Sequence, residues 1–198
     1  MRWNASNRHV KVKSMNVKHT AESIETMKWR GGEATVRHEE DMCKWDRRKI
    51  VTLFVDASTS WGIGIVIDGK WTAFKLHHDW KVEGRDICWL ETVAVEILIY
   101  ILEAMGISNT TLLIHSDNQG TIGSLAKGRS RNFHINLSIR RAYIVLVSHS
   151  IIPELVYIAS EDNPADPISR GELGSIDSQL TVSFSLPDEL RQILLDVS

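Results

Sequence analysis

The sequence is poor in the features that mark secreted and membrane proteins. It contains two cysteines, Cys43 and Cys88, too few for a disulfide framework, and no stretch ahead of them resembles a secretory signal. The most apolar stretch, residues 92–105, is short and carries Glu96 and Glu103, which argues against a membrane span. We therefore expect an intracellular protein, in the cytoplasm or the nucleus, with no membrane partner.

The chain also lacks a strong excess of either charge. It has 23 Lys and Arg against 25 Asp and Glu, a net charge of −2, which argues against a dedicated high-affinity nucleic-acid binder on bulk electrostatics. The charge is uneven, because residues 1–50 carry 12 basic against 7 acidic side chains (+5) and residues 51–198 carry 11 against 18 (−7). A basic arm ahead of an acidic domain fits either a phosphate-rich partner or a solvated linker.

What the sequence does contain is an acid inside a strongly apolar stretch. Residues 50–55 are β-branched or large and apolar, which predicts a strand buried on both faces, and Asp56 follows directly. A buried carboxylate costs several kcal/mol unless it is paired, protonated or bound to a metal. A second apolar run over residues 63–67 and the Asp68-Gly69 turn signal predict a three-strand meander that ends at residue 76.

After the meander, predicted helices and strands alternate. The expected elements are a helix over 89–105, a strand over 110–116, helices over 119–126 and 134–148, a strand over 153–158, a helical turn within 163–170, and a last helix over 187–197. The order βββαβααβα predicts an α/β fold, a five-stranded mixed sheet flanked by helices. We expect a basic N-terminal extension (1–48), the α/β domain (49–172) and a C-terminal tail with a short helix (173–198).

This topology brings four acids toward one another. Asp56 lies in the first strand, Glu91 in the first turn of the long helix, Asp117 at the end of the fourth strand and Asp166 in the last helical turn. Four carboxylates cannot share a pocket as anions without cations, and oxygen ligands suit Mg²⁺ or Mn²⁺. Two such ions about 4 Å apart stabilise the attacking and leaving oxygens of a phosphoryl displacement.

The same positions carry a resemblance to a known family. The segments are Asp56-Ala-Ser, Leu90-Glu91-Thr-Val-Ala, Ser116-Asp117-Asn118 and Asn163-Pro-Ala-Asp166-Pro-Ile-Ser-Arg-Gly171. Together they resemble the ribonuclease H domain of retrotransposon reverse transcriptases, in the ribonuclease H-like superfamily. The resemblance implies a ribonuclease H-like fold and an endonuclease that hydrolyses the RNA strand of RNA–DNA hybrids with two Mg²⁺ or Mn²⁺ ions. It assigns catalysis and metal binding to Asp56, Glu91, Asp117 and Asp166, with Asp56 bridging both metals.

One of these four assignments has a rival. Glu96 lies five residues after Glu91, on a different face of the predicted helix. The small and apolar residues after Glu91 fit the family better, and a position near the helix start suits an acid because of the helix dipole. We therefore favour Glu91.

Substrate contacts are predicted from the residues around this site. Ser58 and Asn118 are candidates for contact with the nucleic-acid backbone. Where some relatives carry a substrate-binding protrusion, this chain has a basic group that either binds the hybrid's phosphates or is an ordinary charged surface: Lys127, Arg129, Arg131, Arg140 and Arg141.

Two further hypotheses for the function are considered beside the ribonuclease H assignment. A catalytically inactive nucleic-acid-binding or structural module derived from a retroelement would normally have lost acids, and all four are present here. A transposase or integrase of the same fold would carry Glu on the last helix, where this chain has Asp166. The polymerase part of a reverse transcriptase is a candidate protein partner.

Overall fold

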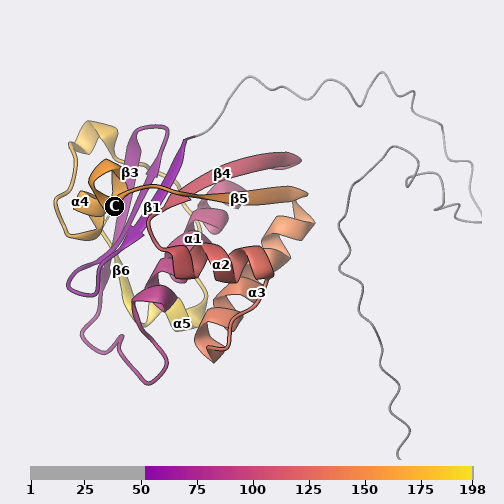
Figure 1. The fold of residues 1–198 in the computed structure, drawn as a ribbon. Helices are drawn as coiled ribbons and strands as arrows, with labels where there is room; N and C mark the ends of the chain where they lie inside the picture. Colours follow the sequence, from indigo (N-terminus) through magenta and orange to yellow (C-terminus); the bar gives the residue numbers. More distant parts are fainter. Residues whose placement is uncertain (1–51, 198) are drawn as a thin grey trace, which may run out of the picture. The chain divides into compact units, whose positions relative to one another are not determined.

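The computed structural model describes residues 52–197, and the predicted basic extension over residues 1–48 lies outside them. A single sheet organises this part of the chain (Figure 1). Its strands are β1 (Leu53–Ala57), β2 (Gly62–Ile67), β3 (Lys70–Leu76), β4 (Thr110–Ser116), β5 (Ile151–Tyr157) and β6 (Leu194–Asp196). They are arranged in the order β5-β4-β1-β2-β3-β6.

The sheet is mixed, as predicted. β1, β4 and β5 run parallel to one another, whereas β2 is antiparallel to β1 and to β3. The change of direction occurs at β1, whose two neighbours are antiparallel β2 and parallel β4. In open α/β sheets, ligands bind where the order of the strands reverses, and here this point lies between β1 and β4. Asp56 lies in β1, opposite Gly64 of β2.

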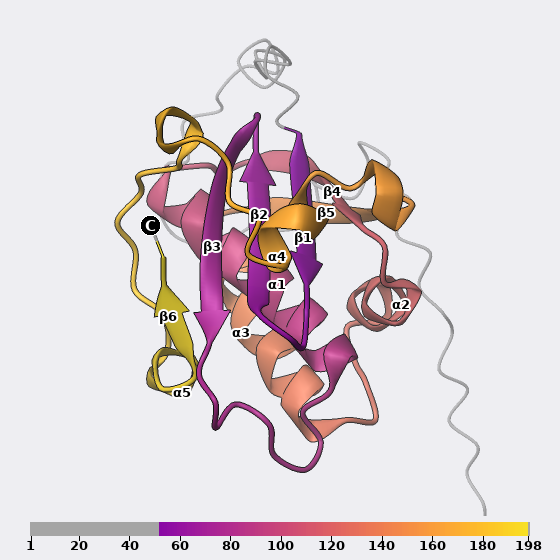
Figure 2. The same cartoon turned by 90° about the vertical axis from the view of Figure 1, so that its left-hand side faces the viewer.

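Helices lie on both faces of the sheet (Figure 2). The long helices α1 (Ile87–Ala104) and α3 (Phe133–Ser148) pack against each other on one face, and the short α4 (Ala165–Ser169) packs on β1 and β2 on the other. α2 (Gln119–Lys127) follows β4 and contacts β5 and α1. The predicted α/β fold, with its element order up to α4, is confirmed.

Local signals explain where the helices begin and end. The side chains of Asp86, Asn118 and Asn132 accept hydrogen bonds from the first free backbone N–H groups of α1, α2 and α3, which is the usual role of a residue at a helix start. Gly106 and Gly128, both with positive φ, follow α1 and α2 and allow the chain to leave the helix.

The C-terminal tail differs from the prediction. A helix over residues 187–197 was expected, but α5 covers only Asp188–Arg191 and the chain then forms β6 along the free edge of β3. The prediction was wrong because a short apolar run does not distinguish a helix from a strand. The strand is favoured because it pairs its backbone with β3 and buries Leu194 in the core. The sheet therefore has six strands instead of five.

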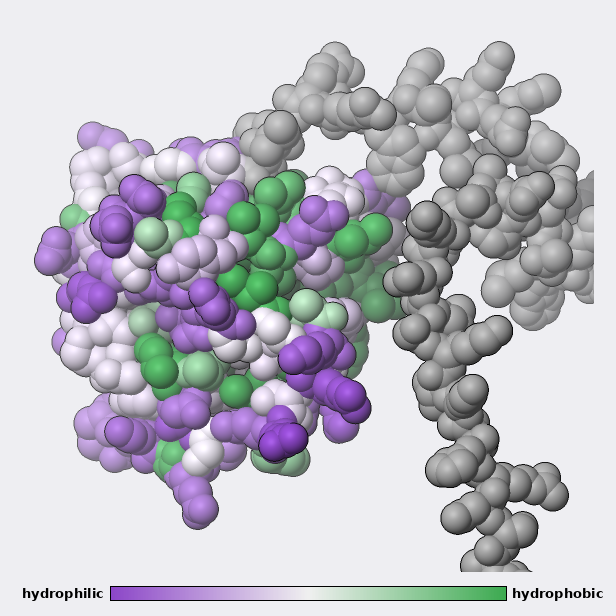
Figure 3. Space-filling view, in the orientation of Figure 1, coloured by the Kyte–Doolittle hydropathy of each residue, from purple (hydrophilic) through white to green (hydrophobic). Residues whose placement is uncertain are grey.

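The surface over β4 and β5 is partly apolar. Leu113 and Ile152 lie on these neighbouring strands with 40% and 61% of their surface exposed, and Figure 3 shows hydrophobic side chains over the same strands. No helix among the described residues has both the length and the apolar character needed to cross a bilayer.

Candidate active site

The predicted acids gather at one open cavity of about 360 Å³. β1 supplies Asp56, α1 supplies Glu91, the residue after β4 is Asp117, and α4 supplies Asp166. The remaining residues of its lining are Ala57, Ser58, Thr59, Ile87, Asn118 and Arg170. The structure therefore brings together all four predicted acids, and two predicted substrate contacts, Ser58 and Asn118, lie beside them.

Three of the acids form a tight group. Asp56, Asp117 and Asp166 each offer a carboxylate oxygen, and these three atoms lie within 4.8 Å of one another. Glu91 lines the same cavity from deeper in the fold, where it is 97% buried and its Oε1 accepts a hydrogen bond from the backbone N–H of Ala57 at 3.3 Å. Its other oxygen, Oε2, is buried and has no hydrogen-bond partner among the residues that the structure describes.

Neighbouring side chains hold the three aspartates. The Ser169 hydroxyl donates to Asp56 and the Ser160 hydroxyl donates to Asp117. The Arg170 guanidinium donates two hydrogen bonds to Asp166, at 2.9 and 2.8 Å. Ser160 was not predicted, because its position beside Asp117 depends on the pairing of β5 with β4 and leaves no signal in the local sequence.

Burial and crowding change the acidity of the site. Burial, together with the charges of Asp117 and Asp166, raises the pKa of Asp56 to about 7, although the hydrogen bond from Ser169 acts in the opposite direction. Burial raises the pKa of Glu91 to about 9, and the neighbouring Asp56 and Asp117 charges add to the shift. The pKa of Asp166 is lowered, mainly by the hydrogen bonds from Arg170. Two acids thus resist ionisation unless a cation is present.

These features fit a hard divalent cation. The donors are all carboxylate oxygens, which Mg²⁺ and Mn²⁺ prefer. Burial and repulsion between the acids raise the pKa values of Asp56 and Glu91, and a nearby cation would offset both effects. Within the described part of the chain, Glu91 Oε2 accepts no hydrogen bond and is free to bind such a cation. Asp56, Asp117, Asp166 and Glu91 are the residues that would hold it.

A glycine on β2 allows α4 to pack close to the sheet at the site. Gly64 lies opposite Asp56 on β2, and a Cβ atom there would come within 2.4 Å of the Ala165 carbonyl oxygen and 2.5 Å of the Ser169 N. Only a residue without a side chain lets α4 approach β2 this closely. This close approach brings Asp166 and Ser169 of α4 to Asp56.

The rival acid, Glu96, has a structural role. It is fully buried and pairs with Arg141 of α3, with an Nε–Oε1 distance of 2.5 Å. Arg141 also bonds Glu189 of α5 at 2.9 Å, so its guanidinium is used to hold three helices together. Glu96 does not line the cavity. Arg141, which was predicted to contact the hybrid's phosphates, instead binds Glu96 inside the fold.

The other predicted basic residues are exposed at a distance from the acids. Lys127, Arg129 and Arg131 lie at the end of α2 and in the loop after it, and Arg140 lies on the outer side of α3. α2 begins next to Asn118 and spans nine residues, roughly 13 Å at 1.5 Å per residue. The loop follows the end of α2 opposite to Asn118, and none of its residues lines the cavity.

Comparison of the chain with protein-family models and with curated proteins finds no match. Among solved structures, it is similar to ribonuclease H1 from the halophilic archaeon Halobacterium salinarum. The two share 15% sequence identity with a TM-score of 0.43, over 62% of this chain and 98% of the archaeal protein.

Proposed function

We propose that this chain is a ribonuclease H, an endonuclease that uses divalent metal ions to hydrolyse the RNA strand of RNA–DNA hybrids. The observation that carries the proposal is the convergence of Asp56, Glu91, Asp117 and Asp166 on one open cavity. These are the acids to which the resemblance to the ribonuclease H domain assigns catalysis. A purely structural role does not account for a buried carboxylate oxygen without a partner, such as Oε2 of Glu91.

The roles of the residues follow from their contacts. Two bound Mg²⁺ or Mn²⁺ ions would stabilise the attacking and leaving oxygens of the phosphodiester. The chain itself holds the carboxylates in position, because Ser169 orients Asp56 and the Ala57 N–H orients Glu91 while leaving Oε2 available. Arg170 keeps Asp166 ionised, because its hydrogen bonds favour the charged form.

The hybrid would lie across the cavity mouth and the α2–α3 loop. Ser58 and Asn118 line the cavity and can meet the RNA strand near the scissile phosphate. Lys127, Arg129 and Arg131 are exposed farther along and can contact phosphates without reading sequence. Arg140 is exposed on α3 and can extend this surface, whereas Arg141 is left out because Glu96 and Glu189 bind its guanidinium.

We also infer an origin in a retrotransposon reverse transcriptase, with the polymerase part of such an enzyme as a candidate partner. The support is the run Asn163-Pro-Ala-Asp166-Pro-Ile-Ser-Arg-Gly171, together with the three other motifs in the same order. Binding of the chain to a purified retroelement polymerase domain, measured by calorimetry, tests this inference separately from catalysis.

Cleavage of a labelled RNA–DNA hybrid tests the proposed activity. The assay compares Mg²⁺, Mn²⁺ and a chelator, with single-stranded RNA and duplex RNA as other substrates. Asp117→Asn removes one charge from the cavity and keeps the shape of the side chain. Glu103→Gln is the matched control, because this acid lies on α1 with 41% of its side chain exposed and does not line the cavity.

We expect cleavage of the hybrid alone, dependent on the metal, lost in Asp117→Asn and retained in Glu103→Gln. Absence of cleavage in both metals by a folded sample would contradict the proposal. Retained binding of the hybrid in that case would favour the inactive nucleic-acid-binding module.

A further inference from the structure

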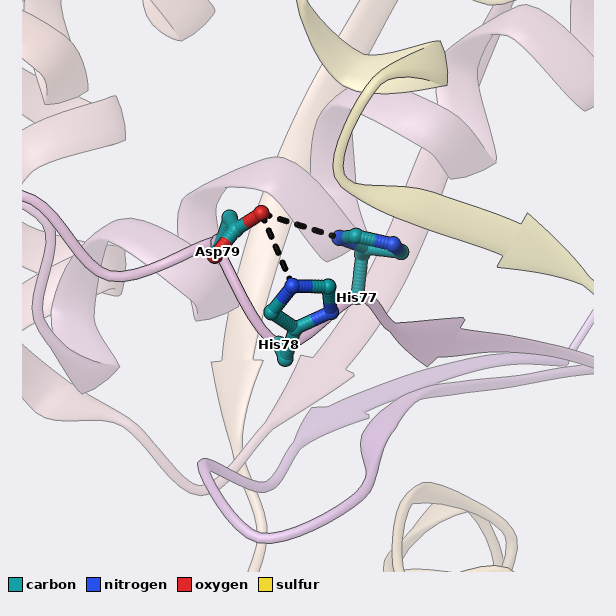
Figure 4. Close-up of side chains that lie close together, drawn as sticks. All are labelled: His77, His78 and Asp79. Atoms are coloured by element: carbon teal, nitrogen blue, oxygen red, sulfur yellow. Dashed lines mark ion pairs between the residues drawn. The ribbon is translucent and has the colours of Figure 1, made fainter.

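A second group of possible metal ligands lies where the sheet leads into α1. His77, His78 and Asp79 follow β3 directly, and Figure 4 shows both imidazole rings directed at the Asp79 carboxylate. Asp79 Oδ2 lies 3.0 Å from His78 Nε2 and 3.8 Å from His77 Nδ1. The two rings pack with their centroids 4.0 Å apart.

The geometry suits a zinc ion better than an ion pair alone. The 3.0 Å ion pair accounts for the position of His78, but His77 Nδ1 is too far from Asp79 for a hydrogen bond. This nitrogen is shielded from solvent and has no hydrogen-bond partner among residues 52–197. Each of the three residues offers one ligand atom, and these atoms lie within 4.8 Å of one another. Zinc–nitrogen bonds of 2.0–2.1 Å place tetrahedral ligands roughly 3.3 Å apart, between the two distances observed.

The donor set also separates this group from the acidic cavity. Two imidazole nitrogens and one carboxylate oxygen suit zinc, whereas Mg²⁺ prefers oxygen ligands alone. We propose that His77, His78 and Asp79 bind a zinc ion, with solvent completing the coordination. The ion fixes the segment from residue 77 to residue 86, which connects β3 to α1.

The segment from residue 77 to residue 86 contacts both the C-terminal tail and α1. The His77 N–H donates to the Ile193 carbonyl at 2.8 Å, which ties the segment to the residue before β6. Trp80 is buried and stacks on Trp89 of α1, with ring centroids 6.3 Å apart. Asp86 then begins α1, the helix that carries Glu91. Zinc would therefore stabilise the junction of β3, the C-terminal tail and α1.

Zinc titration of the full chain by calorimetry tests the proposal. A large excess of Mg²⁺ is included, so that the oxygen ligands of the acidic cavity do not contribute. The variants are His78→Ala and Asp79→Asn, both at exposed positions, and the matched control is His149→Ala, outside the group. All of these proteins share Cys43 and the histidines of residues 1–51, so only the difference between them reports on the group.

We expect the wild type and His149→Ala to bind one more equivalent of zinc than His78→Ala and Asp79→Asn, or to bind it at least tenfold more tightly. Zinc should also slow hydrogen exchange over residues 77–86 in the wild type alone. Equal zinc binding by all four proteins would overturn the site. Loss of zinc binding in the two variants, with no zinc effect on exchange in the wild type, would overturn the role in fixing the segment.

Discussion

Two glutamates of α1, five residues apart, show how the environment of a side chain decides its use. Both are buried, but Glu91 faces the cavity with one oxygen unpaired, and Glu96 faces α3 and is neutralised by Arg141. A buried carboxylate with a cationic partner supports the fold once it has formed, whereas a buried carboxylate without one destabilises it. The paired carboxylate, Glu96, is typical of a structural residue, and the unpaired carboxylate, Glu91, is typical of a functional site.

Substitution of each glutamate by glutamine should separate these roles. Glu91→Gln should lower hybrid cleavage by about two orders of magnitude or more, because a carboxylate at the cavity is lost. Its unfolding free energy in chelator at pH 8 should equal or exceed that of the wild type, because no charge remains to be buried. Glu96→Gln should lower the unfolding free energy by about 3 kcal/mol, because it leaves Arg141 without its main partner.

Denaturant unfolding and single-turnover cleavage measure the two effects. The assignment of roles would be contradicted if Glu96→Gln abolished cleavage at full stability, or if Glu91→Gln unfolded the chain and left the activity of the folded fraction unchanged.

At the scale of elements, the site depends on how closely α4 approaches the sheet. Asp166, Ser169 and Arg170 all come from α4 or the residue that follows it, and all act on the acidic group. The approach is possible because Gly64 presents no side chain to the α4 backbone. A change on β2, which contributes no acid, should therefore affect the chemistry.

Gly64→Ala tests this dependence. Its methyl group would meet backbone atoms of Ala165 and Ser169, so α4 must move away. We expect a loss of about 1–3 kcal/mol in unfolding free energy and a fall in cleavage of at least tenfold. Gly123→Ala is the matched control, because a Cβ there meets nothing within 4 Å and should raise helix stability by up to about 1 kcal/mol. Equal activity of the two variants would show that the approach of α4 is unimportant.

The basic loop after α2 should act through charge alone. Replacing Arg129 and Arg131 together by alanine should weaken hybrid binding. It should also make the negative slope of the logarithm of the association constant against log salt shallower, by roughly 1 for each phosphate that is no longer neutralised. Binding is measured with the catalytically silent Asp117→Asn variant over a range of salt concentrations. Lys75→Gln, at an exposed position of β3, should leave the slope unchanged. An unchanged slope in the double variant would show that the loop does not contact the hybrid's phosphates.

At the scale of the whole molecule, the acidic cavity links stability to pH and metal. The pKa of Asp56 in the folded chain, about 7, exceeds its ordinary value, and so does that of Glu91, about 9. A group whose pKa is raised by folding stabilises the fold at low pH and loses that contribution as the pH rises through the folded-state pKa. Without metal, stability should therefore fall from about pH 4, where both acids begin to ionise in the unfolded chain, up to about pH 9, where Glu91 ionises in the folded chain.

Thermal unfolding in chelator and in Mg²⁺ measures this linkage. We expect the midpoint to fall across this pH range in chelator, and Mg²⁺ to restore most of the loss at the upper end, because a bound cation favours the ionised acids. Asp56→Asn should show a shallower pH dependence and a smaller response to Mg²⁺. A response to Mg²⁺ equal to that of the wild type would place the cation elsewhere.

The sequence predicted most of this molecule correctly where local chemistry decides structure. Apolar runs marked β1, β2 and β4, and helical periodicity marked α1. The small and apolar residues after Glu91 and its position near the helix start favoured it over Glu96, and the structure brings Glu91, not Glu96, to the cavity. The catalytic roles of the four acids remain predictions for the cleavage experiments.

The sequence did not reveal what depends on contacts between distant segments. The run from Leu190 to Asp196 has no local preference strong enough to choose helix or strand, and the free edge of β3 made the choice. Arg141 reads as one more surface cation until α1 and α5 bring Glu96 and Glu189 to it. Ser160 reaches Asp117 only because β5 pairs with β4.

Residue types and their spacing, in the sequence by itself, determined which acids this chain offers and in which order its elements follow. Periodicity and helix caps depend on a few neighbouring residues, so they can be recognised from the sequence alone. The tertiary structure alone decided the partner of each charge, the position of the last strand and the acidity of Asp56 and Glu91. Those properties arise from burial and from charges that approach one another only when segments far apart in the chain pack together.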